Sequence, residues 1–333
     1  MSAEGDSSYN EDDEVSKGRS FSQEWYRFYD EVGAPTDHHR LVNIEKQLAN
    51  YEAAWRSFPG SDAPSLDDTD DAMAASRTPA EILGDALFHL GLVQRIVLSR
   101  SVVLYKAFIR SLNQEDYDSC PLLLRAIMEQ GAFGVHTARQ IRHGFEAYRA
   151  EGPNARRDFL QAIRSAVFGA KINMPAFFAS LSEEIPTAST WIKRGELDHV
   201  MKLMDNREFS EKTVPREAKG SSAASVSSMI DALDAEHLKE NFTPELCRTT
   251  WEWLSQYCHP SYFSWQFHEF DVLQGGLHVW SEDERSALKF KALIQFIEIM
   301  SGLVRLLPGF AIDKLFELES EITQERDALR GSS

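Results

Sequence analysis

The feature that most constrains this fold is a long helical pattern that begins at Thr78 and continues unbroken to about Asn113. Thr78 suits the N-cap, Pro79 the first helical position, and Glu81 the third position after the cap, where its side chain can close a capping box. A helix of about thirty residues is far longer than the usual helix of a globular protein. Such a length is typical of a helix bundle and argues against a helix that packs beside a sheet.

A second helix with unusual glycines is predicted to follow from about Asp118. It carries Gly131 and Gly134 in its interior, and each weakens a helix by about 1 kcal/mol relative to alanine. We therefore expect another backbone, or a ligand, to approach the helix closely at these two positions.

The remaining chain is also mainly helical in pattern. Further helices are predicted over 155–171, 175–184, 190–204, from Thr243 to His259, from Ser281 to about Leu307, and after Pro308-Gly309. Alternating aromatic and apolar residues around a Gly-Gly turn predict one small β-hairpin near 262–280. The predicted class is all-α, a multi-helix bundle of nine or ten helices with this single hairpin.

Composition shifts along the chain predict its domain organisation. Residues 1–19 are acidic and almost free of apolar side chains, so we expect a disordered tail that folding does not require. Two amphipathic helices over 20–57 predict an N-terminal helical hairpin, and the proline-containing acidic stretch 58–78 a linker. The main helical domain is predicted over 79–330, with a mobile loop at 205–228 where large apolar residues are scarce.

Composition also limits the partners and the compartment. The 333 residues carry 35 Lys and Arg against 52 Asp and Glu, a net charge of -17. Nucleic acid would therefore need a local basic patch. Three cysteines without a CxxC pair exclude a disulfide framework, and the N-terminus does not match a signal peptide. The best membrane-span candidate, Leu90 to Ile109, is interrupted by Arg95, Arg100 and Lys106, which are unfavourable in a bilayer. We predict a cytoplasmic protein without a membrane partner; its oligomeric state is left open.

Several common enzyme classes lack their motifs here. The chain has no GxGxxG, no GxxxxGK[ST], no GxSxG and no HExxH, and no cofactor is predicted. One pattern is compatible with a metal site: Glu196 and His199 form the Glu-x-x-His element of di-iron bundles, which needs a second copy and two further glutamates. The nearest second copy has Asp234 in place of Glu before His237. A metal-binding bundle therefore stays a minor alternative, and no metal ligand is predicted.

The first candidate site element is the pair Arg125 and Glu129. They lie four residues apart, so they share a helix face, and their neighbours are nearly all apolar. A partly buried Arg and Glu need each other or other polar partners. Two interpretations follow: an ion pair that holds helices in register, or an anion anchor beside an acid–base carboxylate.

The second element is the run that contains Ser255, His259 and Ser261. A residue before proline rarely stays helical, so His259-Pro260 should close its helix. The imidazole then faces the negative end of the helix dipole, which favours its protonated form and suits acid–base work. The alternative is a C-capping histidine with hydroxyls that satisfy loose carbonyls.

Together these residues carry a resemblance. A helix with Arg125-x-x-x-Glu129, followed by Leu254-Ser255-x-x-x-His259-Pro260-Ser261, resembles a widespread group of uncharacterised bacterial helical proteins. These are similar in layout to the HEPN superfamily, which includes ribonuclease toxins and phage-defence effectors. The resemblance covers about residues 79 to 307. It implies a metal-independent ribonuclease in which His259 is the acid–base group, Arg125 binds phosphate and Glu129 orients one of them.

One departure from the HEPN pattern bears on activity. The catalytic HEPN motif is an arginine, four to six residues, and then a histidine. The corresponding positions before His259 hold Glu252, Trp253 and Leu254, and the spacing is matched only by Arg194 and His199. Arg125 would then have to supply the charge from another helix.

Two classes of function therefore remain, and whether the chain is an enzyme is open. A ribonuclease would bind RNA through a local basic cleft, for which the candidates are Arg125, Arg139, Arg142 and Arg149. A non-catalytic interaction or regulatory scaffold would instead bind a protein partner through the aromatic hairpin that carries Trp265, Phe267 and Phe270. The net charge of -17 favours the scaffold.

Overall fold

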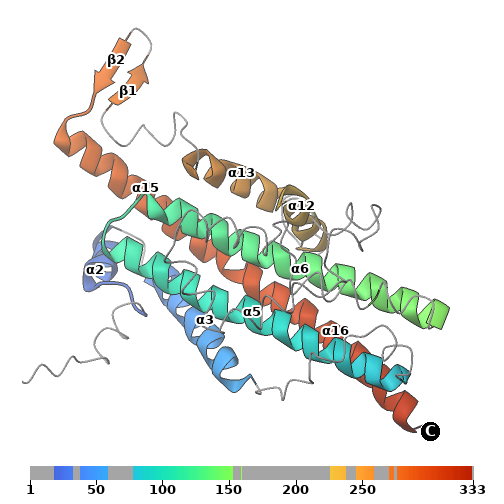
Figure 1. Ribbon diagram of the computed structural model, residues 1–333. Helices are drawn as coiled ribbons and strands as arrows, with labels where there is room; N and C mark the ends of the chain where they lie inside the picture. Colours follow the sequence, from blue (N-terminus) through green and yellow to red (C-terminus); the bar gives the residue numbers. More distant parts are fainter. Residues whose placement is uncertain are drawn as a thin grey trace, which may run out of the picture. The chain divides into compact units, whose positions relative to one another are not determined.

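The computed structural model describes residues 19–32, 38–58, 78–152, 159, 226–237, 245–258, 270–273 and 276–331 (Figure 1). The chain divides into two compact units. Unit 1 comprises Met1–Pro59, Gln94–Ala138 and Val226–Glu317; unit 2 comprises Gly60–Val93, Arg139–Ser225 and Leu318–Ser333. Both candidate site elements belong to unit 1.

The described residues confirm the all-α class. Their helices are α2 (Gln23–Val32), α3 (His38–Ser57), α5 (Pro79–Asn113), α6 (Ser119–Glu151), α12 (Val226–His237), α13 (Leu246–Cys258), α15 (Glu282–Gly302), the short 3-10 helix η4 (Val304–Leu306) and α16 (Leu307–Gly331). Two short strands, β1 (Phe270–Leu273) and β2 (Gly276–Val279), pair antiparallel with Phe270 opposite Val279.

Several predictions fall outside these residues. The helices predicted over 155–171, 175–184 and 190–204 lie there, apart from Phe159, and so does the loop predicted over 205–228 up to residue 225. Residues 262–269 and 274–275 of the predicted hairpin also lie there. The number of helices, the full hairpin and the domain boundaries therefore stay predictions.

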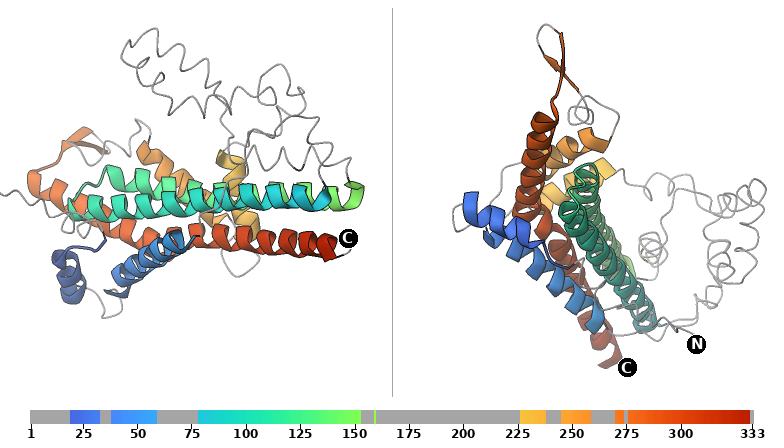
Figure 2. Two further views of the ribbon diagram at one scale, coloured as in Figure 1. Left: turned by 60° about the horizontal axis from the view of Figure 1, so that its bottom comes forward. Right: turned by 90° about the vertical axis from the view of Figure 1, so that its left-hand side faces the viewer.

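Helix α5 begins where the sequence places it. The Thr78 amide donates to Glu81 Oε2 at 2.6 Å, and the Glu81 amide donates to Thr78 Oγ1 at 3.4 Å, which is the predicted capping box. The helix then runs for 35 residues to Asn113. In unit 1 its second half and the first half of α6 lie side by side in every view (Figures 1 and 2).

By length and composition alone, α5 could cross a membrane. Among the described residues the bent pair α15–α16 also passes this test, if its 41° bend is taken as one broken span. In α5, 44% of the most apolar window is buried. The core helix of a soluble protein can have the same length and composition, so these two properties do not distinguish a core helix from a membrane span.

The two interior glycines of α6 meet another backbone, as predicted. A Cβ atom at Gly131 would lie 2.8 Å from Leu307 Cβ and 3.0 Å from the Leu307 carbonyl carbon. A Cβ atom at Gly134 would lie 2.7 Å from Ala311 Cβ. Real Cβ atoms do not approach so closely, because protein interiors are already close-packed. The absence of side chains at these two positions lets the first turns of α16 lie directly on α6.

The junction of α15 and α16 differs from the prediction. The Ser281–Glu284 capping box is confirmed, but α15 ends at Gly302 rather than near Leu307. Pro308 lies inside the first turn of α16, where its missing amide hydrogen has no helical partner to lose. The prediction was wrong because it treated Pro308-Gly309 as a break between helices. Proline is instead favoured in the first turn of a helix, which is where Pro308 lies in α16.

Two buried tyrosines stabilise this junction from other helices. The hydroxyls of Tyr51 on α3 and Tyr105 on α5 both donate to the Arg305 carbonyl, at 3.2 and 2.6 Å. Burial raises the pKa of both phenols, most strongly that of Tyr105, so both stay protonated and able to donate. The carbonyl in the 3-10 turn thereby gains partners from two further helices.

The N-terminal segment packs against the rest of unit 1. The Trp25 indole N–H donates to the Leu112 carbonyl at 3.2 Å, and helix α3 packs on α15. Glu52 on α3 forms ion pairs with Lys106 of α5 at 2.5 Å and with Arg19 at 3.4 Å. Arg19 is the last residue of the predicted tail and the first residue that the structure describes. Residues 1–18 lie outside the description.

The contact at the glycines predicts that alanine lowers stability at Gly131 and Gly134 but raises it at a glycine without such a contact. Replacing Gly131 and Gly134 by alanine should lower the free energy of unfolding by about 1–3 kcal/mol, because the added methyl groups overpack the α6–α16 contact. The matched control is Gly84→Ala in α5, where a Cβ atom meets nothing within 4 Å. This variant should gain up to about 1 kcal/mol from helix propensity. Urea denaturation measures both, and a stable double alanine variant would contradict the packing.

Candidate functional site

The helix that leads to the second motif is held at its start by a carboxylate from another helix. The Cys247 and Arg248 amides of α13 donate to the two carboxylate oxygens of Asp234 on α12, at 2.9 and 2.8 Å. Asp234 is buried. A carboxylate satisfies the free amides and complements the helix dipole at this end. Burial and the Asp234 charge raise the pKa of the Cys247 thiol, so that thiol is protonated and inert.

This contact corrects the predicted start of the helix. The sequence places it at Thr243, whereas α13 begins at Leu246. Glu245 has φ +63°, a left-handed conformation that cannot belong to the helix. Because the cap comes from Asp234, 13 and 14 positions before the two amides that it accepts, a local sequence pattern could not locate it.

Asp234 is also the residue that stands in place of the glutamate in the second, weaker copy of the Glu-x-x-His metal pattern. Both of its oxygens accept amides of α13. Over the residues that the structure describes, no group of three His, Cys, Asp or Glu side chains is placed to hold a metal ion. Glu196 and His199 lie outside those residues, so the first element is untested.

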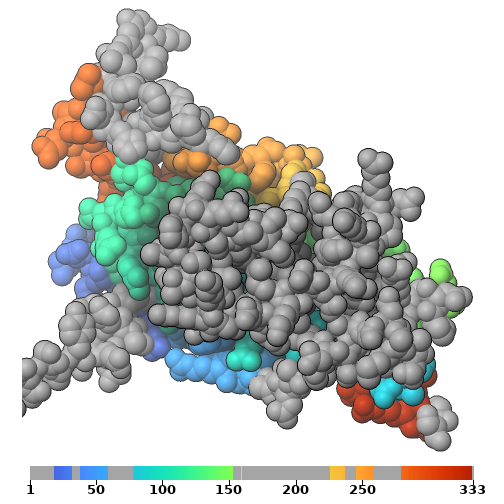
Figure 3. Space-filling model, viewed as in Figure 1, coloured from blue at the N-terminus to red at the C-terminus, as the bar shows by residue number. Residues whose placement is uncertain are grey.

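Arg125 and Glu129 form the ion pair that their spacing predicts. Arg125 Nε donates to Glu129 Oε1 at 2.7 Å, and the two side chains are 23% and 32% exposed. The pair is therefore neither fully buried nor on the open surface. It lies on the side of α6 that faces α13, and α12 and α13 are visible beside α6 in the space-filling view (Figure 3).

Trp251 of α13 joins this pair and was not among the predicted site residues. Its indole N–H donates to Glu129 Oε1 at 3.0 Å. Its ring lies under the guanidinium, with Arg125 Cζ 5.1 Å from the ring centroid, within the range of a cation–π contact. The sequence shows Trp251 only as one apolar position on a helical stripe. The available signal was the indole N–H, since a partly buried tryptophan needs an acceptor.

The C-terminal end of α13 also reaches the arginine. Cys258, the last residue of the helix, lies close enough to Arg125 to affect its charge. The Cys258 thiol itself donates to the Leu254 carbonyl at 3.4 Å. Partial burial by itself lowers the pKa of Arg125, but the interactions with Cys258 and Glu129 outweigh it and raise the pKa above the ordinary value. The guanidinium is thus charged at every pH of interest.

The remaining predicted residues are placed as follows. Ser255 is buried, and its hydroxyl donates to the Trp251 carbonyl of its own helix at 2.6 Å. His259 and Ser261 lie outside the described residues, although His259 follows Cys258 directly in the chain. The structure therefore brings Arg125 and Glu129 together with Trp251 and Cys258, and it leaves Ser255 bonded within α13.

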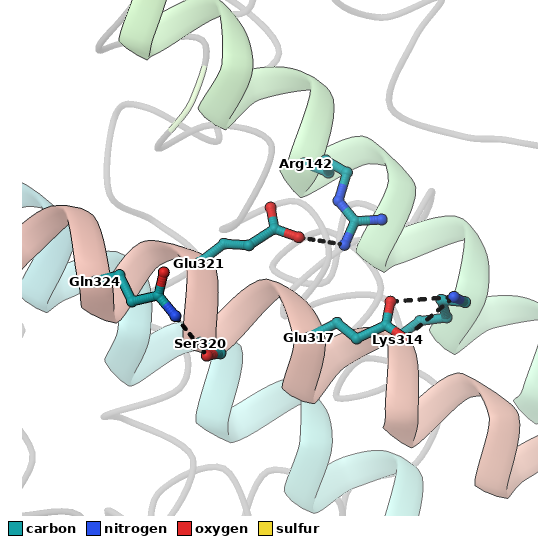
Figure 4. Close-up of polar contacts among 6 residues, drawn as sticks. All are labelled: Arg142, Lys314, Glu317, Ser320, Glu321 and Gln324. Atoms are coloured by element: carbon teal, nitrogen blue, oxygen red, sulfur yellow. Dashed lines mark hydrogen bonds and ion pairs between the residues drawn. The ribbon is translucent and has the colours of Figure 1, made fainter.

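Two of the other three arginines of the predicted basic cleft face acidic partners. Within unit 2, Arg142 of α6 pairs with Glu321 of α16 at 3.0 Å (Figure 4). Arg149 of α6 pairs with Glu325 of α16 at 3.3 Å. Figure 4 also shows Lys314 and Glu317 paired along α16. Arg139 is exposed. These contacts offset much of the positive charge that RNA would require.

No protein-family model, no curated protein and no solved structure matches this chain. The resemblance to HEPN-like proteins therefore rests on the sequence motifs alone.

The partly buried pair predicts an intermediate energetic effect. Arg125→Ala removes the partner of a half-covered carboxylate and leaves the Trp251 ring uncovered. We expect a loss of about 1–3 kcal/mol in unfolding free energy, between the values for exposed and fully buried pairs. Arg248→Ala is the comparison, because Arg248 also pairs with a glutamate four residues away and with Asp231 of α12, but both of its carboxylate partners are more than half exposed. Equal, negligible losses in both variants would contradict the described packing.

Proposed function

We propose that the chain is a cytoplasmic, metal-independent ribonuclease of HEPN-like layout, with Arg125, Glu129 and His259 at its centre. One observation carries this proposal. The two sequence motifs lie on separate helices that meet at the Trp251–Glu129 hydrogen bond, and Arg125 of the first motif lies close to Cys258 of the second. Cys258 is covalently joined to His259, so the histidine is attached to the residue that the guanidinium contacts.

The chemistry needs few groups. In metal-independent RNA cleavage the 2′-hydroxyl loses a proton to a base and its oxygen attacks the adjacent phosphorus. The bond to the 5′-oxygen breaks, an acid returns a proton to that oxygen, and a 2′,3′-cyclic phosphate remains. A histidine can serve as the base or as the acid. The fixed charge of Arg125 would stabilise the extra negative charge on phosphorus in the transition state.

Glu129 fits the orienting role. Its Oε1 accepts from Arg125 Nε, which fixes the guanidinium while its terminal amino groups stay directed elsewhere. Arg125 is 23% exposed at its side chain, so a phosphate could reach it. This arrangement would let Arg125 replace the arginine that HEPN proteins carry before the histidine. Ser255 and Ser261 remain candidates for residues that support His259 through hydrogen bonds.

A second function is favoured by a different observation. Arg125 and Trp251 both donate to Glu129, and Arg142 and Arg149 each face a glutamate. Such contacts suit a non-catalytic scaffold, in which the polar residues only join helices. The scaffold would bind a protein partner through the predicted aromatic hairpin. Val279 at the end of β2 is 67% exposed and would belong to that surface.

Cleavage of RNA separates the two functions. Purified protein is incubated with total RNA in the presence of EDTA, and the new 5′ ends and cyclic phosphates are mapped. If the ribonuclease proposal is right, His259→Ala should lower the cleavage rate by about 10²–10⁴-fold. It should leave the melting temperature almost unchanged.

The matched control is His143→Ala, which removes an exposed histidine of α6 that belongs to neither motif. It should cleave like the wild type. Absence of new ends with the wild type, or equal cleavage by the wild type and His259→Ala, would exclude the ribonuclease and leave the scaffold.

A further inference from the structure

We propose that Trp251 is a positioning residue: it fixes the Arg125 guanidinium so that its terminal amino groups face the C-terminal end of α13. A catalytic effect of this positioning rests on the proposed ribonuclease function, whereas the positioning itself does not depend on that function. Trp251 belongs to neither sequence motif, and it contacts both charges of the first motif at once.

The direction of the guanidinium follows from its donors. Arg125 has a single hydrogen on Nε, and Nε donates to Glu129 at 2.7 Å. The interaction of Arg125 with Cys258 therefore falls to its terminal amino groups. These groups are the ones left to bind phosphate oxygens, and they lie on the side of the residue before His259.

Trp251 supports this direction in two ways. Its N–H donates to the same Glu129 oxygen that accepts from Arg125, which holds the carboxylate in place. Arg125 Cζ lies over its ring, 5.1 Å from the centroid, so the ring limits how far Arg125 can move on that side. Loss of the N–H alone should therefore loosen Glu129, and through it the arginine, while the ring is kept.

The same helix provides a matched comparison. At about 100° per residue, positions 251 and 258 share one face of α13, whereas 253 lies on the other side. Trp253 accordingly contacts Tyr257 and, on α15, Phe296, at 5.0 and 6.0 Å between ring centroids. Trp253→Phe makes the same chemical change as Trp251→Phe without touching Arg125.

Cys258 offers a direct reporter of the guanidinium. Cys120 and Cys247 are buried, whereas Cys258 is partly exposed. The experiment compares the alkylation rates of Cys258 with iodoacetate, which is negative, and iodoacetamide, which is neutral, by mass spectrometry of the intact folded protein after digestion. A nearby positive charge speeds the reaction with the anion relative to the neutral reagent.

The ratio of the two rates should fall roughly fivefold in Arg125→Gln, the effect of one charge at about 4 Å in water. Trp251→Phe should move the ratio most of the way to that value, and Trp253→Phe should leave it at the wild-type level. Trp251→Tyr also lacks the indole N–H and serves if Trp251→Phe does not fold. A wild-type ratio in the folded Trp251 variants, or equal ratios in the wild type and Arg125→Gln, overturns the proposal.

RNA cleavage by the same variants links the proposal to function. Trp251→Phe should lower kcat about tenfold, the effect of one lost hydrogen bond to a charged group, with little change in KM. A wild type that shows the alkylation effect but cleaves no RNA would reject the ribonuclease and keep Trp251 as the residue that positions Arg125. A cleaving wild type with an unchanged ratio in Trp251→Phe would reject the positioning role alone.

Discussion

The close approach of α16 to α6 at Gly131 and Gly134 is the constraint on which the candidate site depends. At about 100° per residue, these glycines lie roughly opposite Arg125 and Glu129 on α6. One side of the helix is therefore fixed by backbone contact with α16, and the other side presents a charged pair to α13. Because there is no space for a methyl group between α6 and α16, α6 cannot shift or turn without losing this contact, and the pair is held where Trp251 and Cys258 can reach it.

The elements around α6 are joined by buried polar contacts between helices. Tyr51 and Tyr105 bind α3 and α5 to the Arg305 carbonyl in the turn before α16. Asp234 binds α12 to the start of α13. Each contact places a polar group from one helix on an unpaired backbone group at the end of another, where a helix leaves such groups free. The bend at η4 and the start of α13 are in this way defined by tertiary partners.

Local chemistry predicted the parts of this structure that depend on neighbours in the chain. The capping boxes at Thr78 and Ser281, the length of α5 and the need for close contact at Gly131 are of this kind, because helix starts and glycine penalties act within a few residues. The Arg125–Glu129 pair was also predictable, since it lies within one helical turn. The break at Gly302 and the Asp234 cap were not, because their partners are distant in the sequence. Trp251 was missed for the same reason: periodicity assigned it to an apolar stripe, and its N–H found Glu129 only through tertiary packing.

The central claim is that α6 and α13 are joined through a hydrogen bond between the Glu129 carboxylate and the Trp251 indole. A double-mutant cycle on the free energy of unfolding measures this bond directly, with Glu129→Ala, Trp251→Phe and the double variant. A hydrogen bond to a charged group predicts that Trp251→Phe destabilises the wild-type background by about 1.5 kcal/mol or more. In the Glu129→Ala background the same substitution should have almost no effect, a coupling of about 1–2 kcal/mol. An equal loss in both backgrounds would show that the two residues do not interact and would contradict the site described for this protein.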